Sequence, residues 1–207
     1  RDGQIALLEA VVGSSTSGGL KFHLARLHRD RMAPGDLDRA IDMAEQATAG
    51  IDFNHPWVLW VQLLRLRDPD AAVEAAELAV GQVAPAKGLS AVYQLLGALL
   101  DHRGLVESAI DRLLEGAERV GSYSLRLFEE ALFFAAPEAS DESIDRVVRR
   151  LNETESDLGP ARHLAAVLQL ERESRWEDAA LSARAGRRDF PRYLHLAFHE
   201  VLCWLGA

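Results

Sequence analysis

Hydrophobic residues recur along the chain at the spacing of amphipathic helices. Ala, Leu, Glu and Arg, which favour helices, dominate the sequence, and alternating runs rich in Val, Ile and Tyr are missing. Glycine and proline interrupt the pattern at short intervals and leave segments of roughly 12 to 16 residues, a usual helix length. The pattern therefore predicts an all-α protein of about a dozen helices.

A short phrase recurs near the start of every second predicted helix. Its small residue is Ala40, Ala72, Ala109, Ser143 and Ala179, at successive spacings of 32, 37, 34 and 36 residues. Two helices and two tight turns take about 34 residues, and a small side chain early in the second helix lets the first helix approach closely. Because one helical hairpin cannot bury its apolar faces alone, the spacing predicts about five stacked hairpins.

The third copy of this phrase lies within "LLGALLDHRGLVESAIDRLLEGAERV", which resembles a tetratricopeptide repeat. Gly97 falls at the small position of the first helix, and Ala109 and Gly116 fall at the two small positions of the second helix. The fifth copy, "RWEDAALSARAGRRDFP", is in phase at Ala179 and Gly186. The resemblance implies a right-handed α-solenoid of about five tetratricopeptide-like hairpins.

The expected domain order follows from this repeat array, which covers residues 20–190. An N-terminal helix over residues 1–12 and a C-terminal capping helix over residues 191–207 are expected to flank it. Residues 13–19 are interpreted as a Ser/Gly linker. The stretch "GSSTSGGLK" has the glycine separation of a phosphate-binding loop, but glycine stands where the lysine of that loop belongs and no strand precedes it. We therefore expect no nucleotide or other cofactor.

Composition narrows the class of partner and the compartment. The 207 residues carry a net charge of −9 with no basic segment, which disfavours nucleic acid as a partner. No apolar run approaches the ~20 residues of a membrane span, so we expect no membrane partner. The single cysteine, Cys203, excludes a disulfide framework and fits the cytoplasm. The presence of only two lysines, Lys21 and Lys87, beside many arginines is typical of a GC-rich, bacterial genome.

The strongest candidates for chemistry lie near the C-terminus. His195, His199 and Cys203 share one helical face, but Cys203 lies about 12 Å along the axis from His195, so the three cannot bind one ion. A histidine pair alone supplies too few ligands for a metal site. We expect these groups to line the inner face of a terminal helix. No nucleophile motif of the form G-x-S-x-G occurs, and we predict no catalytic residue, no metal and no enzymatic activity.

The family resemblance implies a non-catalytic scaffold that binds a peptide, helix or partner domain in a concave groove. An alternative is a sensor or oligomerisation module of a larger signalling or regulatory protein. The groove-facing positions of the family fall mostly on first helices of the hairpins. The resulting candidate residues are Arg29, Trp57, Gln94, Asp101, His102, Phe128, Leu132, Leu164 and Leu168.

Four of these candidates predict an apolar groove. Phe128 and Leu132 lie one turn apart, and Leu164 and Leu168 repeat the arrangement on the next first helix. If all four side chains are exposed, we expect a ligand, a second subunit or a neighbouring domain to cover them. If the phase of the helices differs by one or two residues, these side chains belong to the core.

Overall fold

The computed structural model describes residues 1–13, 15–49, 51–121, 124–138, 140–154 and 158–206. Within these ranges the chain forms twelve α-helices, one short 3-10 helix and no strand. The predicted all-α class is therefore confirmed. None of the helices in these ranges is long and apolar enough to cross a bilayer.

The chain divides into two compact units, Arg1–Leu100 and Asp101–Ala207, and the division falls near the end of one helix. The helices of the first unit are α1 (Asp2–Val12), α2 (Gly18–Arg31), α3 (Asp36–Thr48), α4 (Asn54–Arg67), α5 (Pro69–Gln82) and most of α6 (Leu89–His102). The helices of the second unit are α7 (Val106–Val120), α8 (Leu125–Glu138), α9 (Asp141–Glu153), α10 (Gly159–Arg172), α11 (Trp176–Asp189) and α12 (Leu194–Gly206).

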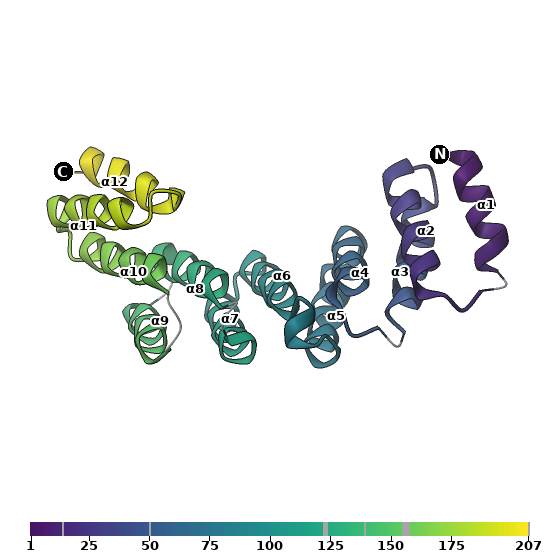
Figure 1. Ribbon diagram of the computed structural model, residues 1–207, viewed down its shortest axis with the longest axis horizontal. Coiled ribbons are helices and arrows are strands. Elements are labelled where there is room, and N and C mark those ends of the chain that lie inside the picture. The colour runs from purple at the N-terminus through teal and green to yellow at the C-terminus, as the bar shows by residue number, and fades with distance from the viewer. Residues whose placement is uncertain (14, 50, 122–123, 139, 155–157, 207) are drawn as a thin grey trace. The chain divides into compact units, whose positions relative to one another are not determined.

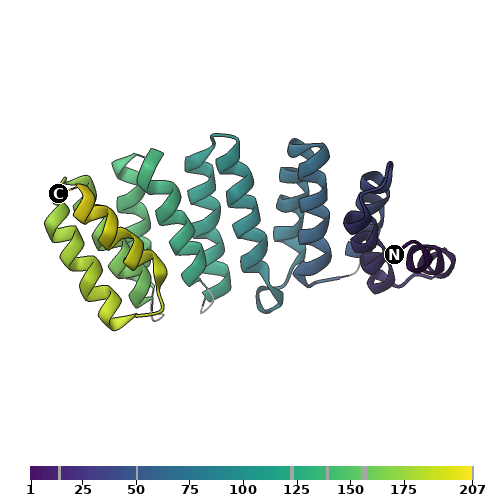
Figure 2. The ribbon, with the colours of Figure 1, turned by 90° about the horizontal axis from the view of Figure 1, so that it is seen from above.

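Helices that follow one another in the chain lie side by side within each unit (Figure 1 and Figure 2). In the first unit α1 packs on α2, α2 on α3, α3 on α4 and α4 on α5. In the second unit α7 packs on α8, α10 on α11 and α11 on α12. The second unit also has contacts between helices two apart, α8 with α10 and α10 with α12. These additional contacts bury helix faces that a single hairpin would leave open.

The recurring small residues lie on buried faces of their helices. Ala40, Ala72, Ala109, Ser143 and Ala179 lie early in α3, α5, α7, α9 and α11, and each is at most 1% exposed. A larger side chain at these positions would hold the neighbouring helix away. The sequence therefore identified the contact face of each of these five helices.

The segment predicted as a linker is partly helical. α2 begins at Gly18, so Gly18 and Gly19 belong to the helix, while Ser14 lies outside the described residues. A Cβ on Gly18 would lie 2.8 Å from the Cδ1 of Ile51 and 3.1 Å from the carbonyl oxygen of Ala47. Gly18 is thus a packing residue that lets α2 approach the end of α3.

Candidate interaction surface

The four residues predicted to line an apolar groove are buried. Phe128, Leu132, Leu164 and Leu168 are 2%, 0%, 0% and 3% exposed. The expectation that these side chains are exposed is wrong, because α8 and α10 pack against each other and against their neighbouring helices. These four residues are core, as the alternative phase predicts.

The remaining groove candidates do not form an apolar groove together. Trp57 is buried, and its indole Nε1 donates a hydrogen bond to the carbonyl oxygen of Ile51 at 3.0 Å, so this groove candidate belongs to the core. Arg29 and Gln94, in the first unit, are half-buried. In the second unit Asp101 is half-buried and His102 is exposed. These four polar residues remain candidates for contact with a partner, but they belong to two different units and no shared binding site is described for them.

An exposed apolar surface lies elsewhere, on α12 of the second unit. We call it the α12 outer face. At 100° per residue its large side chains fall within an arc of about 160° of the helix, and they are 42% to 80% exposed. They are Leu194, Phe198, Val201, Leu202, Trp204 and Leu205.

The opposite face of α12 carries Leu196 and several polar groups, and it packs against α10 and α11. His199 and Cys203 are 6% and 0% exposed. The Nδ1 of His199 lies 2.8 Å from Oε1 of Glu171 on α10, and the thiol of Cys203 donates to the same oxygen at 3.0 Å. His195 packs its ring against that of Phe133 on α8, with centroids 4.6 Å apart. The expectation that these three groups line the inner face of a terminal helix agrees with the structure.

Buried Glu200 completes this inner face. Its two carboxylate oxygens lie 2.8 Å from the Nε of Arg184 and 3.2 Å from the Nε of Arg187, both on α11. Two guanidinium groups thus compensate one buried carboxylate. The guanidinium of Arg184 also lies over the ring of Trp204, 5.5 Å from its centroid.

The polar face of α12 is suited to structure rather than chemistry. Burial raises the pKa of the Cys203 thiol to about 12, and the nearby Glu171 carboxylate adds to this shift. The thiol is therefore protonated near neutral pH and is a poor nucleophile. Within the described part of the chain, no three His, Cys, Asp or Glu side chains are arranged to hold a metal ion.

α12 therefore buries polar groups together with Leu196 on its inner face and exposes most of its large apolar side chains on its outer face. The sequence pattern contained this information. Apolar residues recur at positions 194, 197, 198, 201, 202 and 205, and the polar residues 195, 199 and 200 lie between them. The positions of the histidines predict the inner face correctly, but the exposed apolar face was not predicted. It also departs from the polar outer surface that a capping helix requires.

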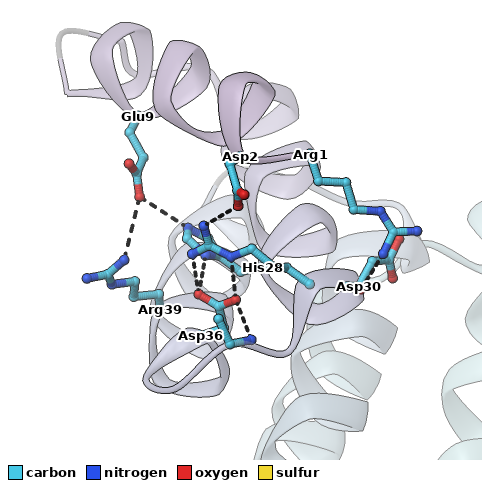
Figure 3. A network of polar contacts seen from close by, with 9 residues as sticks. Arg1, Asp2, Glu9, His28, Asp30, Asp36 and Arg39 are labelled. Atoms are coloured by element: carbon cyan, nitrogen blue, oxygen red, sulfur yellow. Dashed lines mark hydrogen bonds and ion pairs between the residues drawn. The ribbon is translucent and has the colours of Figure 1, made fainter.

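A second polar cluster fixes α1 to the first hairpin (Figure 3). Asp36 is fully buried and accepts hydrogen bonds from Arg31 Nε at 2.7 Å and Arg31 Nη2 at 2.6 Å. His28 lies between two carboxylates, with Nδ1 3.0 Å from Asp36 and Nε2 3.4 Å from Glu9. Glu9 also lies 3.9 Å from Arg39. Since Glu9 belongs to α1 and the other residues belong to α2 and α3, these polar contacts hold α1 against the α2–α3 pair.

A smaller apolar depression of about 400 Å³ lies between α1 and α2. Four leucines form much of its lining, with Arg26 and Asp30 beside them. Only Leu7 among these leucines is strongly exposed, at 67%. This depression exposes less apolar surface than the α12 outer face and is the weaker candidate.

Comparison with known proteins adds no family to this description. No protein-family model matches the chain, and no curated protein is significantly similar to it.

Proposed function

We propose that this chain is a non-catalytic protein-interaction module built as a right-handed solenoid of five tetratricopeptide-like hairpins. The repeat spacing of the small residues supports this architecture, since these residues are buried on alternate helices. Hairpins stacked in this way present surfaces for proteins and peptides. The contact surface in this proposal is the α12 outer face, which replaces the groove expected from the family pattern.

One observation carries the proposal, the exposure of six large apolar side chains on α12. Monomeric proteins rarely expose contiguous apolar patches above a few hundred Å² unless the patch has a function. The inner face of the same helix is held by specific contacts, because His199 and Cys203 contact Glu171 and Glu200 contacts Arg184. Rotation of α12 to bury its apolar side would break these contacts, so the apolar side awaits a partner.

The chemistry of the surface favours a protein partner in the cytoplasm. The chain carries a net charge of −9, and an uncharged apolar face offers nothing to a phosphate backbone. A single cysteine suits a reducing compartment. The alternative proposal of an oligomerisation module uses the same surface with a different occupant.

Site-specific photocrosslinking in cells that express this protein naturally tests the proposed function. A benzophenone amino acid replaces Phe198 in the full chain, which places the reactive group on the α12 outer face. The matched control carries the same group at Leu66, an exposed leucine on α4 of the first unit. We expect covalent protein adducts from position 198 and not from position 66. Equal adduct formation at both positions, or none at either, would contradict the proposed function.

A further inference from the structure

The α12 outer face has a spacing that is the same in both chain directions. With half-buried Ala197 added and Trp204 set aside, its apolar positions 194, 197, 198, 201, 202 and 205 are separated by 3, 1, 3, 1 and 3 residues. When two such helices lie antiparallel with residues 199 and 200 at the centre, apolar residues meet across the contact. The facing pairs are Leu194 with Leu205, Ala197 with Leu202, and Phe198 with Val201. Side chains spaced by three and four residues form the ridges that interlock between packed helices.

We propose that the partner of the α12 outer face is a second copy of this chain, with the two α12 helices packed antiparallel across a two-fold axis. The inference rests on the proposed function and names its occupant. A two-fold contact brings the same patch of both copies together, so the patch must complement itself. The symmetric spacing of the apolar residues meets this requirement.

The size of the surface fits a dimer. Its six large side chains, each between 42% and 80% exposed, together expose on the order of 700 Å², close to the roughly 800 Å² that each partner contributes to a stable interface. Trp204 extends the surface beyond the symmetric set, and Arg184 lies against its ring. Tryptophan and arginine are enriched where protein interfaces gain most of their affinity.

The charges also permit contact between two copies. The segment Leu194–Leu205 contains one acidic or basic residue other than histidine, Glu200. Glu200 is 6% exposed and turned toward Arg184 and Arg187 of its own chain. Two outer faces therefore meet without opposed like charges, and the acidic residues that give the net charge of −9 lie outside the contact.

Sedimentation equilibrium of the purified full chain measures the association. We expect a concentration-dependent dimer for the wild type. The double variant Val201→Lys/Leu205→Lys places four cations in the symmetric contact and should weaken dimerisation at least about 100-fold. The control Leu66→Lys/Leu78→Lys adds the same charge at exposed leucines of the first unit and should dimerise like the wild type. Unchanged circular dichroism of both variants shows that folding is retained.

Disulfide trapping tests the antiparallel register separately. Copies carrying Phe198→Cys and copies carrying Val201→Cys are mixed and oxidised, while the native Cys203 remains buried. We expect disulfide-linked dimers that form in the mixture faster than in either variant alone. Faster linkage of Val201→Cys to itself would contradict the antiparallel packing.

The outcomes separate the two proposals. A wild-type chain that stays monomeric at 100 μM, or a lysine variant that dimerises as well as its control, overturns the second copy as partner. Photocrosslinks from position 198 to a different protein would then still support the proposed function. A monomeric chain without such adducts would overturn both.

Discussion

Two phenylalanines of the second unit provide a direct test of which helix faces are core. Phe128 on α8 is 2% exposed and Phe198 on α12 is 59% exposed. Replacing each with alanine removes the same atoms from environments that the structure describes as opposite. The substitution pair therefore compares the groove expected from the family pattern with the surface found on α12.

The expected magnitudes follow from burial. Truncation of a buried phenylalanine costs about 3–5 kcal/mol, through lost transfer free energy and the cavity left behind. The side chain of Phe198 is less than half buried, so its truncation forfeits only about 1 kcal/mol of the 1.5–3 kcal/mol that full burial gives. Phe128→Ala should therefore lower the free energy of unfolding by roughly 2–4 kcal/mol more than Phe198→Ala.

Urea unfolding followed by far-ultraviolet circular dichroism measures this difference. The protein is kept dilute enough to remain monomeric, so that loss of a dimer contact does not add to the effect of Phe198→Ala. Equal slopes of free energy against urea concentration for both variants indicate that the denatured states are comparable. Equal destabilisation by the two substitutions, or a larger effect of Phe198→Ala, would refute the assignment of Phe128 to the core.

Three further predictions concern other parts of the fold. Gly186→Ala should destabilise the second unit, because a Cβ there would lie 2.8 Å from the Leu196 side chain of α12. Gly81→Ala should instead stabilise α5 by up to about 1 kcal/mol, because no atom lies within 4 Å of the added Cβ. Urea unfolding of both variants checks this contrast. Hydrogen bonds from Arg31 lower the pKa of Asp36 from its usual 3.8. The ionised carboxylate therefore stabilises the folded protein above pH 3.8, and this stabilisation is lost as the pH falls below 3.8. An Asp36→Asn variant should lose part of the pH dependence of the free energy of unfolding between pH 5 and pH 2. Burial and the Glu171 carboxylate raise the pKa of Cys203 to about 12. A thiol reagent at pH 7.5 should therefore label the native protein far more slowly than the urea-unfolded protein. Comparable labelling rates would contradict the burial of Cys203.

The sequence predicted the helices and their contact faces well because these depend on local pattern. Ala109 and Ala179 lie early in α7 and α11, and both are completely buried. A small residue at a fixed place in the pattern identifies a close helix contact without knowledge of the partner helix. The same reasoning gave the helical class, since glycine and proline mark helix ends through their own backbone preferences.

Exposure of apolar residues was harder to predict because it depends on what lies across from a helix. Leu132 and Leu205 are both leucines on amphipathic helices, yet one is 0% and the other 80% exposed. α8 is covered by α10, and no local pattern contains that contact. On α12 the pairing of His199 and Cys203 with Glu171, at sequence separations of 28 and 32 residues, fixes the polar side inward.

The reach of these polar contacts has a consequence for how the chain folds during synthesis. Arg31 contacts Asp2 at a separation of 29 residues, Ser143 contacts Glu107 at 36, and Cys203 contacts Glu171 at 32. Each contact thus spans only about two helices, and helical proteins dominated by local contacts fold within microseconds to milliseconds. A ribosome needs at least about 2 seconds to add 34 residues at 5–20 residues per second. Each new pair of helices therefore has time to pack on the preceding helices of its unit before the next pair emerges, so that only the most recent apolar face is exposed during synthesis.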